Sequence, residues 1–186
     1  GFFADDTSFA YKRLSAQELR NQYNKTGIVE LKEEYRNIFS SVASIIDDDN
    51  IPSRMSSYSF ELLKSCDFTS IFNQRKNNAK TLIDILKKEA TIEVIQDDIN
   101  VSNLYVPFVI SNRDCKQAEL SKLGIFNTII WPLSDEQKTI CSNSKYIEEH
   151  MLAAPCDQRY SIEDMKYIGK EIVRVVNEKE NNDFRC

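Results

Sequence analysis

The sequence predicts an α/β protein in which long N-terminal helices precede a small sheet of three to four strands covered by helices. Four glycines and four prolines in 186 residues allow few tight turns, which favours helices over an all-β sandwich. In the first half of the chain, apolar residues recur at steps of three and four, as on one face of a helix. After Thr91, short runs of β-branched and aromatic residues are typical of strands.

The first half is predicted to be helical. A helix is expected to begin at Ser15, because the side chains of Ser15 and Glu18 can form a capping box, and to end at Gly27. A second amphipathic helix is expected from Glu30 to Asp47. Two more helical stretches follow Pro52. The second of them carries its apolar residues at Ile71, Ala79, Leu82 and Leu86.

The second half is predicted to mix strands with helices. TIEVIQ (91–96) and YVPFVIS (105–111) have the composition of strands, and Pro107 places the latter at a sheet edge or a bulge. A helix from Arg113 to Leu123 precedes a further strand, FNTIIW (126–131).

The last part of the chain is predicted to be largely helical. Ser134 and Gln137 have the spacing of a capping box, which predicts a helix reaching about His150. LAAPC (152–156) is expected to be a short strand or turn. The final helix is expected to start at Ser161 and to bury the stripe Ile162, Met165, Ile168, Ile172 and Val176.

These elements suggest a division of the chain into a helical segment (1–88), a small α/β domain (89–178) and a polar tail (179–186) that has little to bury and is expected to be disordered.

Composition and charge exclude several classes of partner. Twenty-nine acidic against 24 basic side chains give a net charge of -5, so no broad positive field is available for nucleic acid. No apolar run could span a membrane and no signal peptide is recognisable, which predicts a cytoplasmic protein without a membrane partner. The five cysteines never form C-x-x-C, which indicates reduced thiols rather than a disulfide framework or a zinc site.

The sequence contains no self-contained catalytic motif. It has no G-x-S-x-G elbow, no phosphate-binding glycine loop and no H-E-x-x-H pair. The single histidine, His150, is expected to cap or pack a helix rather than to catalyse. The run Asp47–Asn50 offers oxygen ligands for calcium, but it lacks EF-hand spacing, so a solvated turn is expected and no metal site is predicted.

Several segments together resemble the C-terminal half of DegT/DnrJ-type sugar aminotransferases, which use pyridoxal phosphate. SRMSSYSFELL and the later R-x-x-N-A pattern at Arg75, Asn78 and Ala79 are similar to the stretch after the cofactor lysine of that family. Further along, four segments match the family's strand, helix, strand and closing strand-helix pattern in order: YVPFVIS, RDCKQAELSKLGI, NTIIWP and LAAPCDQRYSIEDMKYIGKEI.

The resemblance implies that the chain is the C-terminal part of the pyridoxal-phosphate-dependent transferase fold, with residues 1–88 linking from a large cofactor domain. In such enzymes a lysine forms a Schiff base with the cofactor. GFFAD looks like the strand that closely follows this lysine, so the lysine is expected upstream of Gly1 and the chain alone is expected to bind no cofactor and to be inactive. Lys12, in TSFAYK, is a rival with unsuitable spacing and is expected to be exposed.

The resemblance also implies cofactor-binding residues after Pro52. Ser53, Arg54 and Ser56 match a helix start that approaches the cofactor phosphate of the neighbouring subunit. The planar fork of an arginine suits phosphate, although a surface salt bridge is the alternative for Arg54. Pro52 stands where the family has an asparagine, which removes that contact.

Three further residues are candidate substrate contacts. Trp131 ends the segment that resembles the family's strand facing the substrate. There its ring can stack on a sugar or base, and a position in the core is the alternative. Arg159 and Tyr160 can bind the carboxylate of the amino donor, unless Arg159 is simply solvated.

The resemblance therefore implies a homodimeric parent enzyme that moves an amino group from an amino-acid donor to a keto-sugar nucleotide, in nucleotide-sugar or surface-polysaccharide assembly. The alternative is a non-enzymatic α/β interaction module with similar packing. An upstream cofactor domain in the gene would favour the enzyme, and a gene beginning at Gly1 would favour the module.

Overall fold

The computed structural model describes residues 7–48, 55–95, 101, 103–130 and 132–178. Internal contacts divide the chain into two compact units at Cys66 and Asp67, whereas the sequence suggested a division near residue 88. The reason is that the helix after Asp67 packs against the last helix of the chain. The predicted disordered tail, 179–186, lies outside the described residues.

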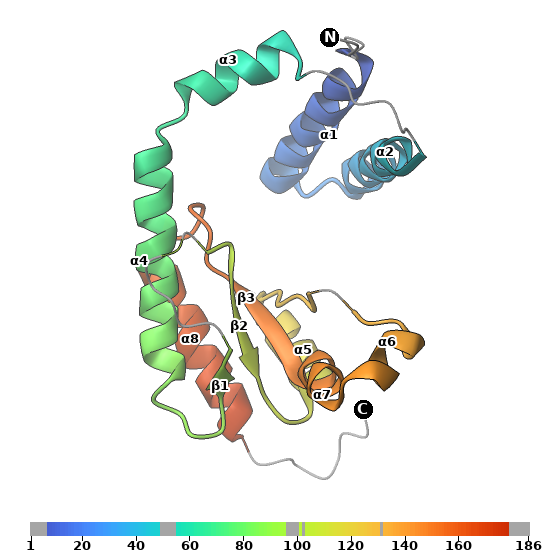
Figure 1. Cartoon of the computed structure of the whole chain (residues 1–186). Coiled ribbons are helices and arrows are strands. Elements are labelled where there is room, and N and C mark those ends of the chain that lie inside the picture. Colours follow the sequence, from blue (N-terminus) through green and yellow to red (C-terminus); the bar gives the residue numbers. More distant parts are fainter. Residues whose placement is uncertain (1–6, 49–54, 96–100, 102, 131, 179–186) are drawn as a thin grey trace. The chain divides into compact units, whose positions relative to one another are not determined.

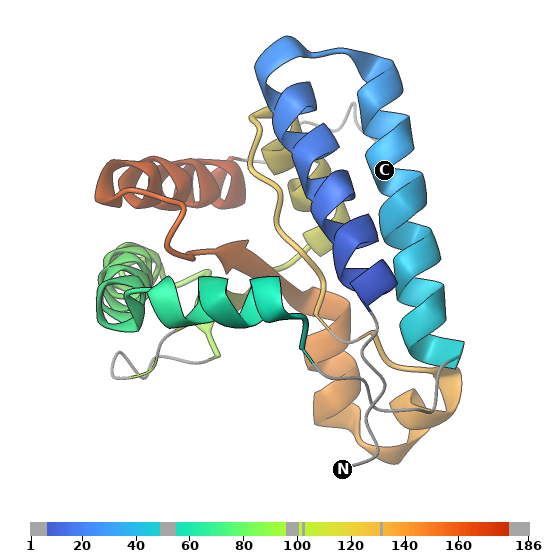
Figure 2. The same ribbon diagram turned by 90° about the horizontal axis from the view of Figure 1, so that it is seen from above.

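The first unit contains an antiparallel pair of helices, α1 (Thr7–Thr26) and α2 (Val29–Asp48), which lie side by side in both views (Figures 1 and 2). Gly27 joins them with a φ of 71°, the left-handed conformation that glycine adopts without steric cost. The rings of Tyr23 and Tyr35 lie 6.0 Å apart across the pair. The predicted second helix and the stop at Gly27 are thus confirmed.

The predicted start of the first helix is wrong. The helix α1 begins at Thr7 and continues through Ser15, so residues 7–11 are not extended and Ser15 is not a cap. The Ser15 hydroxyl instead donates to the carbonyl of Lys12 at 2.9 Å, because an upstream helical turn supplies this acceptor. A capping box can form only where the chain is not already helical.

A third helix of this unit, α3 (Ser57–Ser65), has no buried residue. The hydroxyl of Ser56 caps it by accepting the backbone N–H of Ser59 at 3.1 Å. The sequence predicts one apolar face for this stretch, formed by Met55, Leu62, Leu63 and Cys66, but Met55, Leu62 and Leu63 are exposed. Tyr58 and Phe60 are exposed as well.

The second unit is built on a three-stranded antiparallel sheet with the order β1-β2-β3. Its strands are β1 (Glu93–Val94), β2 (Tyr105–Val109) and β3 (Met151–Pro155). The helices α4 (Phe68–Leu86) and α8 (Ile162–Asn177) lie side by side along it (Figure 1). A sheet of three to four strands covered by helices was predicted, and the α/β class is confirmed.

One face of the sheet and the two long helices form the hydrophobic core. Val106 pairs with Ala154 and Phe108 with Leu152, so these four side chains point to the same face, and all are fully buried. They pack with the apolar stripes of the two helices, which confirms both predicted stripes in large part: Ala79, Leu82, Leu86, Met165, Ile168, Ile172 and Val176.

Pro107 was predicted at a sheet edge or bulge, but it lies in the central strand. Its carbonyl accepts the N–H of Ile95 at 3.1 Å, so its nitrogen also faces the β1 side. The strand β1 ends at Val94, one residue before this pair. The missing N–H of Pro107 therefore falls at the end of the ladder between β1 and β2. It interrupts no longer run of hydrogen bonds between the two strands.

The strand predicted at 126–131 is not formed by its described residues, 126–130. Only Thr128 pairs with the sheet, through two hydrogen bonds of 2.9 and 3.0 Å with Ala153. LAAPC, expected as a strand or turn, supplies most of β3 instead, and its residues are buried on both faces. Residues 126–130 thus contribute a single bridge to the sheet rather than a strand.

The shorter helices largely follow their local signals. The helix α5 (Arg113–Lys122) ends before Gly124, which has a φ of 78°. The expected helix up to His150 is divided into α6 (Asp135–Ile140) and α7 (Ser142–His150). The predicted capping box at Ser134 is confirmed, as is the helix start at Ser161, where the structure shows a second capping box with Asp164.

The described thiols differ from the expectation in one respect. Cys66, Cys141 and Cys156 are free, as predicted, whereas Cys115 is disulfide-bonded. Within the residues that the structure describes, no group of three or more metal-ligating side chains occurs. The described helices include none that is both long and apolar enough to cross a membrane.

The close contact of α4 with α8 at Gly169 gives a first test. A Cβ atom at this position would lie 3.0 Å from Cδ1 and Cγ2 of Ile85. Gly169→Leu is expected to lower the free energy of unfolding by about 1–3 kcal/mol, because the core must shift to admit the side chain. Chemical denaturation measures this. Lys170→Leu, at the neighbouring exposed position, is the control and is expected to change stability by less than about 0.5 kcal/mol. Equal stability of both variants would contradict the packing.

Candidate functional site

The segment Cys156–Ser161, here called the arginine loop, connects β3 to α8 and is held by a buried asparagine of α4. Asn78 is fully buried, and its amide nitrogen donates to the carbonyls of Asp157 and Tyr160, each at 2.9 Å. Gln74, one turn earlier, donates to Asn78 Oδ1 and to the Tyr160 carbonyl, each at 3.0 Å. The loop is therefore fixed to α4 by hydrogen bonds from two amide side chains, one of them fully buried.

Within the loop, Asp157 holds Arg159 in a bidentate ion pair. Arg159 Nε donates to Asp157 Oδ1 at 2.8 Å and Nη2 donates to Oδ2 at 2.7 Å, while the backbone N–H of Arg159 donates to Oδ1 at 3.0 Å. The Asp157 side chain is only 8% exposed, whereas that of Arg159 is 64% exposed. These hydrogen bonds lower the pKa of the Asp157 carboxyl against the effect of burial. The loop thus keeps a charged carboxylate inside and presents a guanidinium outside.

Tyr160 and Arg75 complete the surroundings of this pair. The guanidinium carbon of Arg159 lies 6.0 Å from the centre of the Tyr160 ring, within the range of a cation–π contact. Partial burial raises the pKa of the Tyr160 hydroxyl. Arg75 Nε donates to Gln158 Oε1 at 2.6 Å, which brings a second guanidinium to the loop.

Cys156, at the start of the loop, is not suited to nucleophilic chemistry. It is fully buried, and burial together with the Asp157 charge raises the pKa of its thiol to about 12. The thiol contacts the carbonyl of Asn103 at 3.6 Å. Because the thiolate is the nucleophile, Cys156 is a packing residue at neutral pH.

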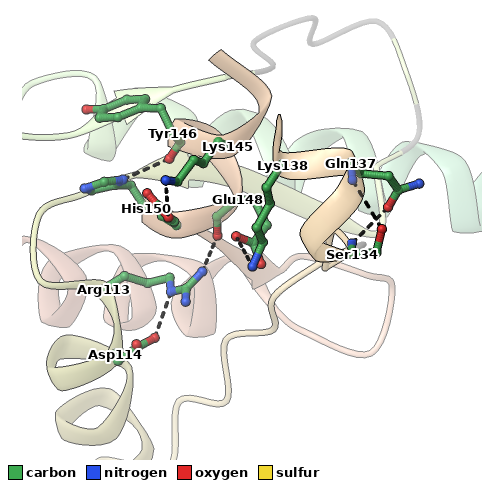
Figure 3. A network of polar contacts seen from close by, with 10 residues as sticks. Arg113, Asp114, Ser134, Gln137, Lys138, Lys145, Tyr146, Glu148 and His150 are labelled. Atoms are coloured by element: carbon green, nitrogen blue, oxygen red, sulfur yellow. Dashed lines mark hydrogen bonds and ion pairs between the residues drawn. The ribbon is translucent and has the colours of Figure 1, made fainter. Parts of the chain in front are cut away.

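A second polar network, drawn in Figure 3, joins α5 to α6 and α7. Arg113 donates to the carbonyl of Glu148 and to Asp114 Oδ1, and Lys138 lies 3.4 Å from the Glu148 carboxylate. His150 Nδ1 lies 2.8 Å from the carbonyl of Tyr146 in the last turn of α7. A carbonyl only accepts, so this nitrogen carries the proton and His150 caps the helix, as predicted. The network fastens helices together and presents no reactive group.

The structure brings together only some of the predicted site residues. Arg159 and Tyr160 share the arginine loop. Ser56 lies at the start of α3, in the other unit, where its hydroxyl serves as the helix cap. Lys12 is exposed on α1, as expected. Four other predictions concern residues outside those described, or residues whose side chains are not described: Ser53, Arg54, Trp131 and the acidic run Asp47–Asn50.

Sequence reasoning missed the residues that position Arg159. Asn78 was noticed only as part of a resemblance, and Asp157 and Gln74 were not noticed. A signal for Asn78 was available, because it lies four and eight residues before Leu82 and Leu86 and therefore on the buried stripe of α4. A polar residue on such a stripe needs a buried partner.

Solved structures share this fold at low sequence identity. A DegT DnrJ EryC1 StrS aminotransferase from Brucella abortus is 16% identical with a TM-score of 0.55, and the match covers 76% of this chain and 44% of that one. A putative sugar aminotransferase from Streptococcus pneumoniae, in its PMP form, is 17% identical with a TM-score of 0.54 over 62% of this chain and 33% of its own.

A third match is a GDP-4-keto-6-deoxy-D-mannose-3-dehydratase from E. coli with bound hydrated PLP. It is 16% identical with a TM-score of 0.53, over 68% of this chain and 38% of its own. No protein-family model and no curated protein sequence matches the chain. The resemblance found in the sequence is therefore confirmed at the level of the fold, and the chain spans less than half the length of these structures.

The attachment of the loop to α4 can be tested at Asn78. Asn78→Ala is expected to lower the free energy of unfolding by about 1–3 kcal/mol, because the two hydrogen bonds from Asn78 to the loop are lost, at about 0.5–1.5 kcal/mol each. The matched control is Asn77→Ala on the exposed side of the same helix turn, which is expected to have little effect. Thermal and urea denaturation measure the difference. Equal losses for both variants would show that the loop does not depend on this clamp.

The Asp157–Arg159 pair predicts a pH dependence of stability. Because the pKa of Asp157 is lowered on folding, the stabilisation it provides is present at neutral pH and is lost as the pH falls through the folded-state pKa. Asp157→Asn is therefore expected to be less stable than the unmodified chain at about pH 7, with a difference that shrinks toward about pH 2. Urea denaturation across this range measures it. A difference that is constant with pH would contradict the ion pair.

Proposed function

We propose that this chain is the C-terminal part of a pyridoxal-phosphate-dependent sugar aminotransferase of the DegT/DnrJ type. The observation that carries the proposal is the shared fold, with TM-scores of 0.52 to 0.55 to several sugar-modifying enzymes. The sequence segments that resemble the family add to it. One neighbour, from Helicobacter pylori, is an aminotransferase involved in pseudoaminic acid biosynthesis. For the present chain we propose a keto-sugar nucleotide as acceptor, in nucleotide-sugar or surface-polysaccharide assembly.

A phosphate-binding site at the start of α3 is part of this proposal. The start of α3 carries the hydroxyls of Ser56 and Ser59 together with first-turn N–H groups, and such a helix start suits a phosphate. We propose that Ser56 contacts the cofactor phosphate there, with Ser53 and Arg54. Bound pyridoxal phosphate supplies an electron sink for amino-group transfer. The residues of this chain would orient it and would leave the covalent step to a lysine elsewhere.

The arginine loop supports a role in substrate binding. Arg159 is exposed, anchored and adjacent to the Tyr160 ring. A planar guanidinium pairs well with a carboxylate, so we propose that Arg159 and Tyr160 receive the carboxylate of the amino-acid donor. Trp131 is proposed to stack on the sugar or base of the nucleotide substrate.

The wider organisation of the enzyme is also a proposal. Residues 1–88 would link the small domain, 89–178, to a large domain that carries the Schiff-base lysine. The enzyme would act as a homodimer in the cytoplasm, and the 186-residue chain alone would bind no cofactor covalently and would not catalyse. The helix α3, with large apolar side chains exposed and none buried, provides a surface that such an assembly can cover.

The same exposed helix is the observation that favours the alternative, a non-enzymatic interaction module. The two functions differ in the gene. A coding sequence with a cofactor domain and a lysine upstream of Gly1 supports the enzyme. A gene that naturally begins at Gly1 supports the module.

Covalent capture of the cofactor tests the placement of the lysine. The chain is to be mixed with pyridoxal phosphate, reduced with borohydride and analysed by mass spectrometry. No site-specific adduct is expected, because the exposed Lys12 has no surroundings that distinguish it from other surface lysines. A longer gene product with the upstream domain is expected to be labelled at one lysine. Stoichiometric labelling of the 186-residue chain that is lost in Lys12→Arg and kept in Lys25→Arg would overturn this placement.

A further inference from the structure

One edge of the Arg159 guanidinium is occupied and another is open. A guanidinium has five N–H groups in a planar fork. Nε and one hydrogen of Nη2 are used by the two oxygens of Asp157, at 2.8 and 2.7 Å. The edge formed by Nη1 and the second Nη2 hydrogen makes no hydrogen bond to any residue that the structure describes, and 64% of the side chain is exposed. This edge has the geometry to bind two oxygens of one oxyanion.

The open edge is held in place by the hydrogen bonds that Asp157 makes to the other edge of the guanidinium and to the Arg159 backbone. Asp157 Oδ1 accepts both the backbone N–H and the Nε–H of Arg159, so one nearly buried carboxylate fixes the main chain and the side chain together. Asn78 fixes the carbonyls on either side of Arg159, those of Asp157 and Tyr160. An arginine fixed in this way loses little conformational freedom when it binds a ligand. An unanchored surface arginine would lose more.

The charges around the pair favour an anion. Arg75 and Arg159 flank the single carboxylate of Asp157, and both guanidinium groups act on it. Asp164, the other carboxylate that contacts the loop, is already hydrogen-bonded to the backbone N–H and hydroxyl of Ser161, both at 2.7 Å. The outward edge of Arg159, beside the Tyr160 ring, is therefore not used by either carboxylate.

We propose that Asp157 is a positioning residue, which holds Arg159 so that its Nη1 and Nη2 edge binds one oxyanion of a substrate. The oxyanion is a carboxylate or a phosphate, and binding forms no covalent bond. The inference rests on the proposed function in one respect only, which is the source of this oxyanion. The two sources are the carboxylate of an amino donor and the phosphate of a sugar nucleotide. The anion site itself is a property of this chain and can be tested without the rest of an enzyme.

NMR titration of the isotope-labelled chain tests the site. Inorganic phosphate and L-glutamate are added separately, each against sodium chloride at the same ionic strength. Saturable shifts are expected in the backbone signals of residues 157–161 and in the Nε–H signal of Arg159, for one probe or both. Saturation by phosphate alone assigns the site to a nucleotide phosphate, and saturation by glutamate assigns it to the donor. Arg159→Lys keeps the charge but loses the fork, and is expected to weaken binding by about tenfold or more.

The variant Asp157→Asn separates positioning from simple charge. It removes a negative charge beside the site, so electrostatics alone predicts tighter binding of an anion. Positioning predicts the opposite, a loss of about fivefold or more, because the guanidinium is no longer held at both nitrogens. Glu163→Gln is the matched control: it removes the same charge from an exposed position of α8 that pairs with Lys166 rather than Arg159. Its affinity is expected to be unchanged or slightly higher.

Three results would overturn the inference. The first is no saturable shift with either probe, the second is binding by Asp157→Asn at least as tight as in the unmodified chain, and the third is equal affinity in Arg159→Lys. If the spectrum shows that Asp157→Asn is unfolded, Arg159→Lys decides, because it leaves the carboxylate paired with a cation. None of these results depends on cofactor capture, so failure of the anion site and failure of the proposed enzyme function are distinguishable.

Discussion

The buried amide of Asn78 is the interaction on which the candidate site depends. It joins residues that are 79 and 82 positions apart in the sequence, and it is fully buried between α4 and the arginine loop. Loss of these two hydrogen bonds would cost about 0.5–1.5 kcal/mol each, so a shifted loop is disfavoured. The end of β3, the start of α8 and one turn of α4 are consequently held in one arrangement.

The ion pair built on this loop differs from ion pairs between two exposed side chains. Lys64–Glu61 and Lys80–Asp84 join two exposed side chains on one helix, and such pairs contribute little because water screens them. In the arginine loop the carboxylate is nearly buried and only the guanidinium is exposed. Burial of one partner orients the other, so the pair provides a fixed positive group at the surface in addition to any stabilisation.

The shared fold does not by itself choose a reaction. Structures with this fold include sugar aminotransferases and a GDP-4-keto-6-deoxy-D-mannose-3-dehydratase. The same framework therefore supports more than one reaction on sugars, and the choice depends on side chains at the site. In this chain the sheet and its helices form the hydrophobic core, and the arginine loop presents a fixed charged group at the surface.

The sequence predictions that were confirmed concern interactions between residues that are close to one another in the sequence. The capping box at Ser134, the helix start at Ser161, the apolar stripes of α4 and α8 and the helix stop at Gly27 are set by residues within a few positions of one another. They were predictable for this reason. Ser15 has the same local pattern as the two caps, but a helix that starts upstream takes over its backbone, and the pattern alone does not show this.

The sequence by itself determined which segments are helical, which faces are apolar and which family the chain resembles. The tertiary structure alone decided that Pro107 lies in a central strand, that FNTIIW contributes one bridge, and that Asp157 and Asn78 position Arg159. The strand partners of Pro107 and Thr128 lie 12 to 46 residues away, and Asn78 lies 79 residues before Asp157. Asp157 is only two residues from Arg159, but the burial that fixes its carboxylate also comes from the closed core. Local propensity contains no information about such partners, since they meet only when the core closes.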